Sequence, residues 1–200
     1  MLTLYHAPKS RSSRFIWLLE ELGATYSVEY VSIPRQDGTG AADPRNPHPD
    51  KKVPALVHDD VLITESVAIA LYLTDLFPKN GIGPQVGDPK RGPYLSWLAY
   101  YAGVMEPLLV TKFSGVGEAD WVKRNWRTPA EMSTRILDVL GAGTYILGSQ
   151  FSAVDIIVTS MGLFARQALP ADAIVDDYLK RTSTRPALQR ALAKDSTPAS

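Results

Sequence analysis

The spacing of hydrophobic residues alternates between that of strands and that of helices in the N-terminal part of the chain. Residues 2–5 alternate as in a strand, and the apolar positions of 15–22 then follow a helical face that Gly23 ends. Residues 26–31 return to a strand pattern. A polar segment rich in Pro and Gly follows at 34–49, where a loop with a short helix is expected.

The next segment predicts a hairpin that leads into a helix. Residues 53–57 and 61–63 are short runs rich in β-branched residues, and Asp59-Asp60 between them is typical of a tight turn. After the second run the hydrophobic spacing becomes helical, and Ser66 is the expected N-cap. The predicted order of the N-terminal part is therefore β-α-β-(α)-β-β-α.

Strand signals fade in the rest of the chain. Residues 79–92 are rich in Gly and Pro and predict a linker. A long apolar helical segment is expected at 94–110, and a further helix at 130–140. Thr128 is placed to cap this second helix, with Pro129 at its first position.

A local folding motif lies near residue 150. Ser152 and Asp155 have the spacing of a capping box, and Phe151 can pack on Ile156 as a hydrophobic staple. This motif is structural, and we assign it no catalytic role. Residues 195–200 are expected to form a frayed tail.

Composition and charge exclude several classes of partner. Hydrophobic residues make up 45% of the chain, and 21 Lys and Arg balance 21 Asp and Glu. This balance gives no electrostatic attraction to nucleic acid or to an anionic membrane. No apolar run approaches the length of a membrane span, and the N-terminus lacks the layout of a signal peptide. We expect a cytoplasmic protein that binds neither nucleic acid nor a membrane.

The chain has no cysteine, which excludes disulfides, thiolate metal sites and any mechanism that uses a protein thiol. Its three histidines, His6, His48 and His58, lack the spacing of metal ligands, so no metal cofactor is expected. Any sulfur chemistry must therefore come from a ligand.

Two positions around the predicted hairpin indicate a ligand site. Pro54 cannot donate to a strand ladder, so it belongs at an edge, a strand start or a cis bend, where a freed backbone group can face a ligand. Glu65 and Ser66 lie at a helix N-terminus, whose N–H groups favour an anion, while the Glu carboxylate can hold an ammonium. A ligand with both charges would suit this corner, although an ordinary strand start and a capped helix explain the pattern equally well.

The motifs around this corner resemble those of the glutathione S-transferase family. Residues 46–47, 52–56 and 65–69 match its pattern NP…KVPAL…ESxAI, and the likeness extends over nearly the whole chain. The resemblance, to bacterial-type members with a serine rather than a cysteine, implies the glutathione S-transferase fold, an α/β thioredoxin-like N-terminal domain followed by an all-α C-terminal domain. The implied boundaries are a glutathione-binding domain at 1–78, a linker at 79–92 and an all-helical domain at 93–200 that contributes the hydrophobic substrate site.

The resemblance also implies an activity. Such a protein is a cytosolic homodimer that uses glutathione as co-substrate, without a metal, and adds its thiolate to a hydrophobic electrophile. Related activities within the fold are reduction of organic hydroperoxides and removal of an ether or halide group. The alternative is a non-catalytic member that acts as a binding or regulatory module. A cysteine-dependent glutaredoxin-like reductase is excluded because the chain has no cysteine.

The usual family device for stabilising the thiolate is a hydroxyl bonded to the glutathione sulfur, and the candidates that the resemblance offers are Ser10, Ser12 and Ser13. Serine-type members place it just after the first strand, four or five residues before an Arg, and Ser10 with Arg14 fits best. Comparison with the cysteine-type bacterial members places their cysteine near Arg11, which leaves Ser12 as a rival. Tyr5 is a third candidate, and at least one serine of this segment is expected merely to cap the helix.

The remaining family roles carry over by position. Lys52 would approach the glycyl carboxylate, although the neighbouring Lys51 leaves that assignment open. The backbone of Val53 would bind the cysteinyl part, with Pro54 in the cis form, and the γ-glutamyl end would meet two residues at the helix start, Glu65 and Ser66.

The second substrate is expected between the domains. A stripe of apolar and aromatic residues would form its wall, although such a stripe is also typical of a helix core. The candidates are Tyr100, Tyr101, Val104 and Met105.

Overall fold

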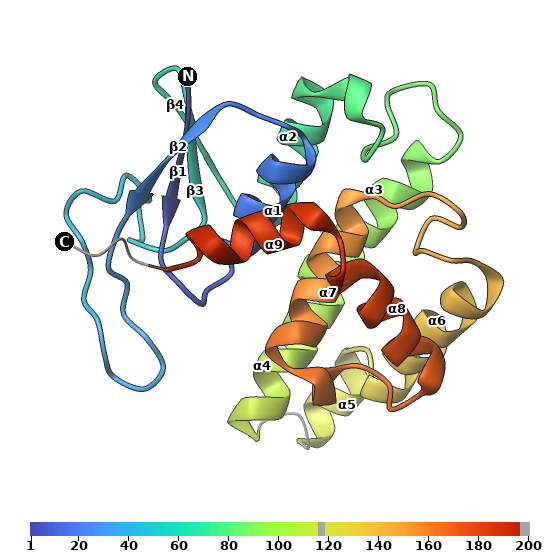
Figure 1. The fold of residues 1–200 in the computed structure, drawn as a ribbon. Helices are drawn as coiled ribbons and strands as arrows, with labels where there is room; N and C mark the ends of the chain where they lie inside the picture. Colours follow the sequence, from blue (N-terminus) through green and yellow to red (C-terminus); the bar gives the residue numbers. More distant parts are fainter. Residues whose placement is uncertain (116–118, 197–200) are drawn as a thin grey trace. The chain divides into compact units, whose positions relative to one another are not determined.

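The computed structural model describes residues 1–115 and 119–196 (Figure 1). Its contacts divide the chain into two compact units. The sheet unit comprises Met1–Asn80 together with Thr184–Ser200, and the helical unit comprises Gly81–Ser183. The end of the chain therefore groups with the N-terminal part, whereas the sequence pattern placed it in the helical domain.

The sheet unit is built on a mixed four-stranded sheet in the order β2-β1-β3-β4. β1 and β2 are parallel and joined by α1, whereas β3 runs antiparallel to both β1 and β4. This topology confirms the predicted α/β fold. The bounds are β1 Leu2–His6, α1 Ser13–Glu21, β2 Tyr26–Tyr30, β3 Ala55–His58, β4 Val61–Thr64 and α2 Ser66–Leu76.

The hairpin turn between β3 and β4 lies where the sequence predicts it. Asp59 and Asp60 both have positive φ, 45° and 56°, as a two-residue turn that matches the strand twist requires. The loop from 31 to 54 holds no helix, so the short helix expected there is not formed.

The predicted cap of α2 is wrong by one residue. Ser66 is the first residue of the helix, and Glu65 occupies the N-cap position without a side-chain capping bond. Glu65 has φ 69°, which turns the chain directly from β4 into α2. Its carbonyl accepts the first helical hydrogen bond, from the N–H of Ile69 at 2.9 Å.

The core of the sheet unit lies between the sheet and the helices α1 and α2, which contact each other as well as the sheet (Figure 1). β1 alternates buried and partly exposed residues. Each fully buried aliphatic or aromatic side chain contributes about 1.5–3 kcal/mol. The fully buried side chains include Leu4, Phe15, Leu19, Leu56, Ile69 and Leu73.

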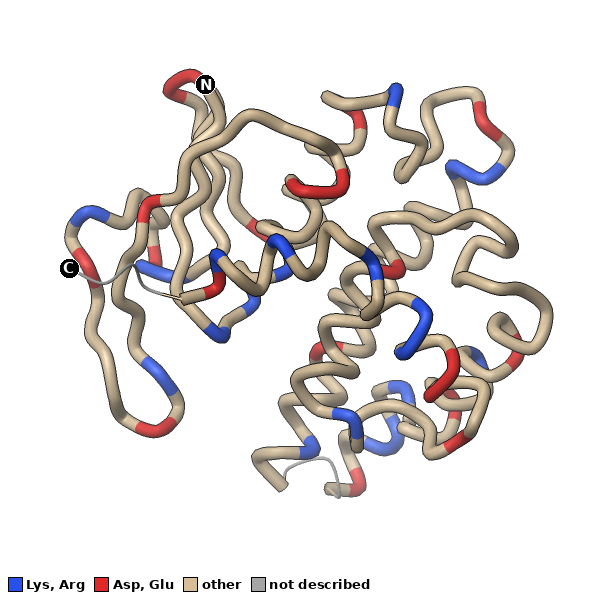
Figure 2. Tube along the Cα trace, viewed as in Figure 1, with Lys and Arg blue, Asp and Glu red and all other residues tan. Residues whose placement is uncertain are grey.

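The helix α9, Pro186–Lys194, joins the sheet unit by packing on α1. Figure 2 shows basic residues recurring along α9, and two of them bind one carboxylate of α1. Glu20 accepts from Lys194 at 2.6 Å and from Arg190 at 2.7 Å. A second pair is bidentate, because Arg185 donates to both oxygens of Glu21.

The helical unit contains the remaining α-helices of the residues that the structure describes. The segment expected as one helix from 94 to 110 changes to a π-helical turn between α3 and α4. The predicted cap of α6 is present and forms part of a capping box, since Thr128 Oγ1 accepts from the N–H of Glu131 at 3.2 Å. The bounds are α3 Arg91–Tyr100, the π turn Tyr101–Met105, α4 Glu106–Ser114, α5 Asp120–Asn125, α6 Pro129–Ala142, α7 Ala153–Phe164 and α8 Ala173–Ser183.

The start of α7 is organised by a buried carboxylate. Asp155 accepts from the N–H of Ser152 at 2.8 Å and from its hydroxyl at 2.9 Å, which forms the predicted capping box. Asp155 also accepts from the N–H of Ile146 at 2.9 Å and from the hydroxyl of Tyr178 at 3.1 Å. One side chain thus joins α7, α8 and the turn before them.

No helix in the part of the chain that the structure describes is both long enough and apolar enough to cross a membrane.

The pairing of α1 with α9 predicts a specific acid sensitivity. Burial alone would raise the pKa of Glu20, but hydrogen bonds from Lys194, Arg190 and Tyr26 lower it from 4.5 to about 2. Because the folded pKa is depressed, this pairing contributes stability that is complete above pH 4.5 and is lost as the pH falls toward 2. In urea unfolding across this range, Glu20→Gln should lose less stability on acidification than the wild type. Glu29→Gln, at an exposed position of β2, is the control and should retain the wild-type slope.

The buried network of α7 predicts a large loss of stability for Asp155→Ala. This change leaves several buried donors without an acceptor, so the free energy of unfolding should fall by about 3 kcal/mol or more. Glu131→Ala, in the exposed capping box of α6, is the matched control and should cost about 1 kcal/mol or less. Equal losses in urea unfolding would contradict a special role for the buried carboxylate.

Candidate functional site

The strand register brings three predicted motifs to one end of the sheet. Tyr5 of β1 pairs with Ala55 of β3, and Ala55 pairs with Thr64 of β4. The chain after β1, the chain before β3 and the chain after β4 therefore leave the sheet at the same end. These segments carry the candidate serines, the Val53-Pro54 pair and the Glu65-Ser66 pair.

The segment before β3 has the geometry that the family resemblance implies. The Val53–Pro54 peptide bond is cis, Pro54 is buried, and β3 begins only at Ala55. The buried Asn46 fixes the preceding loop, because its side-chain amide donates to the carbonyl of Lys52 at 2.9 Å. The backbone of Val53 therefore lies before the first residue of β3 and takes no part in the pairing of the strands.

The two neighbouring lysines differ in their surroundings. The ammonium of Lys51 donates to the carbonyl of Asn46 at 2.7 Å, so Lys51 is part of the loop structure. Lys52 is exposed, and its ammonium makes no hydrogen bond or ion pair with any residue that the structure describes. Of the two, Lys52 is the one able to meet a ligand carboxylate.

The start of α2 presents backbone donors without a side-chain cap. Glu65 is exposed and Ser66 partly exposed, and neither side chain caps the helix. The first N–H groups of α2 therefore remain available to an anion, and the Glu65 carboxylate lies next to them in sequence.

The candidate hydroxyls differ in accessibility. Ser12 is fully buried, with its Oγ 2.7 Å from Nδ1 of His6 and 3.2 Å from the N–H of Ala7. Ser10 is partly exposed, donates to the carbonyl of Ala7 at 2.7 Å and lies 2.7 Å from the hydroxyl of Ser12. The side chain of Tyr5 lies on the opposite face of β1 from that of His6, because successive side chains alternate along a strand. Of the two neighbouring serines, Ser10 and Ser12, Ser10 is therefore the more accessible.

Two residues beside these serines were missed by the sequence analysis. His6 is fully buried, and its Nε2 lies 3.1 Å from Oδ1 of Asp195, off the N–H axis. The same oxygen accepts from the hydroxyl of Ser13 at 2.7 Å and from the N–H of Lys9 at 3.3 Å. Asp195 is thus fixed, contrary to the expected frayed tail, and residues 197–200 lie outside the described part of the chain.

No local signal identifies this pair. His6 lies at the end of a strand and Asp195 follows the last helix, so their approach depends on the packing of α9 on α1. Burial raises the pKa of Asp195, but the adjacent His6 ring and the hydrogen bond from Ser13 outweigh it, and the net shift of the pKa is downward. The carboxylate therefore stays ionised near neutral pH.

The four candidates for the hydrophobic substrate wall lie in different surroundings. Tyr101 and Met105 are buried, and the Tyr101 hydroxyl donates to Glu106. Tyr100 is largely buried, and Val104 is partly exposed.

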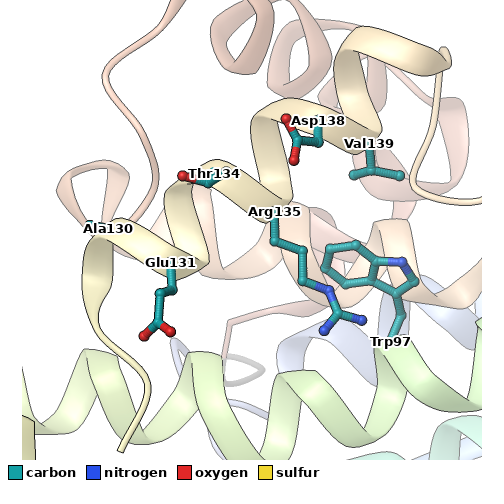
Figure 3. Close-up of a pocket in the computed structure, with 7 residues that line it drawn as sticks. All are labelled: Trp97, Ala130, Glu131, Thr134, Arg135, Asp138 and Val139. Carbon is teal, nitrogen blue, oxygen red and sulfur yellow. The ribbon is translucent and has the colours of Figure 1, made fainter. Parts of the chain in front are cut away.

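A pocket of about 490 Å³ lies along α3 and α6 of the helical unit (Figure 3). The Arg135 guanidinium lies 4.7 Å from the ring centre of Trp97 and 4.0 Å from that of Tyr100. Glu131 and Asp138 also line the pocket. None of the four candidates for the substrate wall lines it.

No group of His, Asp or Glu side chains within residues 1–115 and 119–196 is arranged to hold a metal ion.

A β-α-β unit followed by a β-β-α unit, with a cis proline before the first antiparallel strand, defines a thioredoxin-like domain. Residues 1–75 match the family described as "Glutathione S-transferase, N-terminal domain". Glutathione S-transferase 3 of Schizosaccharomyces pombe is 37% identical over 109 residues, which is 54% of this chain but only 44% of the yeast protein. The family match is thus to the N-terminal domain of glutathione S-transferases, over residues 1–75 of this chain.

Solved structures extend the likeness to nearly the whole chain. A glutathione S-transferase of Actinobacillus pleuropneumoniae superposes with a TM-score of 0.80 at 25% identity, covering 98% of this chain and 93% of that one. A sphingomonad glutathione S-transferase, solved in complex with glutathione, has a TM-score of 0.76 at 25% identity, with 96% and 98% covered. These matches agree with the implied fold, including the helical unit.

Proposed function

We propose that this chain is a glutathione transferase that adds the thiolate of glutathione to an apolar electrophilic carbon, by displacement or by addition to a double bond. The observation that carries the proposal is the convergence of the cis Val53–Pro54 bond, the uncapped start of α2 and Ser10 at one end of the sheet. The enzyme would act as a homodimer in the cytoplasm.

Each part of glutathione has a complementary group at this end of the sheet. The backbone of Val53 would bind the cysteinyl residue through main-chain hydrogen bonds. The γ-glutamyl carboxylate would bind the N–H groups at the start of α2, and its ammonium would pair with Glu65. The glycyl carboxylate would meet Lys52, and Ser66 would add its hydroxyl to the γ-glutamyl site.

Ser10 would lower the pKa of the glutathione thiol. A hydrogen bond to a charged group contributes about 1.5–3 kcal/mol, which corresponds to roughly one to two pKa units. The N-terminus of α1 would add about 0.3–1 kcal/mol. Because a free thiol titrates near 8.5, these contributions would make the thiolate a major species at neutral pH.

The helical unit would supply the apolar wall for the electrophile. Val104 is the most accessible of the four candidates, and Tyr100, Tyr101 and Met105 would support it from more buried positions. Hydroperoxide reduction would use the same thiolate. The second candidate function, a non-catalytic binding module, would retain glutathione binding without a shift of its thiol pKa.

Substitution of Ser10 tests thiol activation. The ultraviolet absorbance of bound thiolate, followed against pH, should give a depressed thiol pKa in the wild type and a value one to two units higher in Ser10→Ala. Tyr5→Phe removes a hydroxyl from the opposite strand face and should leave the pKa unchanged. Binding with an ordinary thiol pKa in the wild type would instead favour the non-catalytic module.

The lysine pair tests the orientation of glutathione. Lys52→Ala should weaken glutathione binding about fivefold, since an exposed ion pair contributes up to about 1 kcal/mol. With glutathione esterified at the glycyl carboxylate, the same substitution should have no effect in calorimetry. Lys51→Ala is the control, because a change in loop structure should alter the binding of both ligands alike. An equal loss for Lys52→Ala with both ligands would contradict the assigned orientation.

A further inference from the structure

A buried line of polar groups leads inward from Ser10. Its hydroxyl lies 2.7 Å from that of Ser12, which lies 2.7 Å from Nδ1 of His6. On the other side of the imidazole ring, Nε2 is 3.1 Å from Oδ1 of Asp195. All four residues belong to the sheet unit, and the line begins at the hydroxyl proposed to meet the glutathione sulfur.

The hydrogen positions along this line follow from the chemistry of each group. A neutral imidazole has one N–H and one acceptor nitrogen, and the carboxylate of Asp195 favours the N–H at Nε2. Nδ1 is then an acceptor, and the hydroxyl of Ser12 donates to it. The Oγ of Ser12 is left to accept from Ser10, whose single hydroxyl proton turns to it from the carbonyl of Ala7, which lies at the same distance of 2.7 Å. In this state every hydroxyl of the line points inward, and the line ends on an unprotonated nitrogen.

We propose that His6 is the internal acceptor for the proton of the glutathione thiol, which reaches it through Ser10 and Ser12. This inference rests on the proposed function. His6 and Asp195 are positioning residues in this scheme, because neither touches the ligand and both act through the serines.

The transfer conserves protons and charge. The S–H bond breaks and its proton passes to Oγ of Ser10, the proton of Ser10 passes to Oγ of Ser12, and that of Ser12 passes to Nδ1 of His6. Both hydroxyls are re-formed, and the products are a thiolate and an imidazolium. The Nδ1–H of His6 and the two hydroxyls then point outward, so that Ser10 donates to the thiolate, while the Nε2–H still faces Asp195.

The surroundings of His6 decide whether a buried imidazolium is tolerated. Asp195 is its direct counter-ion. The ring of Tyr30 on β2 packs edge-on at 5.6 Å, and its hydroxyl donates to the carbonyl of Lys194. Burial and the charge of Asp195 raise the pKa of Tyr30, so this neighbour stays neutral.

α1 and α9 together carry three cations, Arg14, Arg190 and Lys194. Lys194 and Arg190 are both paired with Glu20, at 2.6 and 2.7 Å, which partly offsets their charge. α1 carries the buried Arg14 two residues after Ser12. Because this cation opposes a second positive charge, the scheme depends on the carboxylate of Asp195.

A proton inventory tests the proposal on the wild-type protein. Glutathione is titrated by calorimetry near pH 7 in buffers of different ionisation enthalpy, and the bound thiolate is measured from its ultraviolet absorbance. We expect close to zero protons released per thiolate formed, and a new Nδ1 proton on His6 in nitrogen NMR spectra. One proton released per thiolate would overturn the relay and leave the proposed function intact. Absence of a bound thiolate would overturn thiol activation itself, and the relay with it.

Matched substitutions identify the acceptor. His6→Asn keeps a hydrogen-bond acceptor for Ser12 but cannot take up a proton, so any thiolate that still forms should release about one proton to the buffer. Asp195→Asn keeps the oxygen and removes the charge, and it should release an intermediate fraction.

His58→Asn is the control, because His58 also binds a hydroxyl, that of Tyr72 at 2.6 Å, and lies beside Asp59. It should keep the wild-type inventory. Zero release that persists in His6→Asn would overturn the assignment of His6 as the acceptor.

Discussion

The pairing of β1 with β3, and of β3 with β4, is the constraint on which the candidate site depends. It aligns Tyr5, Ala55 and Thr64 in one row, so three segments distant in sequence meet at one end of the sheet. A slip of β1 by one residue would exchange its two faces. Leu4 would leave the core, and His6 would lose its contact with Ser12. The same register therefore fixes both the hydrophobic core and the polar line behind Ser10.

The elements that the sequence predicts are those with local causes. The Asp59-Asp60 turn, the capping box of Ser152 and Asp155 and the strand that Pro54 precedes all depend on residues close together in the chain. The predicted cap of α2 is wrong by one residue because the positive φ of Glu65 cannot be inferred from its residue type. Whether Ser10 or Ser12 is accessible was also not predictable, because burial depends on the whole fold. The contact of Asp195 with His6 spans most of the chain, and no periodicity marks it.

Two buried or partly buried carboxylates show how context separates structure from chemistry. Asp155 is enclosed among fixed donors of the helical unit, and each of its contacts holds a helix or a turn in place. Asp195 also fixes a loop, through Ser13 and Lys9, but it lies in addition against a titratable ring. Both carboxylates accept several hydrogen bonds, so the number of donors does not distinguish them. What distinguishes Asp195 from Asp155 is a neighbouring ring that can change its charge.

The packing of α9 on α1 has a consequence for how the domain is delimited. The family match ends at residue 75, yet the carboxylate beside His6 follows a helix that begins at Pro186. The sheet unit is thus discontinuous in sequence, with the helical unit inserted into it. A chimera that exchanges the first 75 residues would separate α1 from the helix that packs on it in this chain. An exchange that keeps this packing must therefore include the last helix, α9, together with the N-terminal domain.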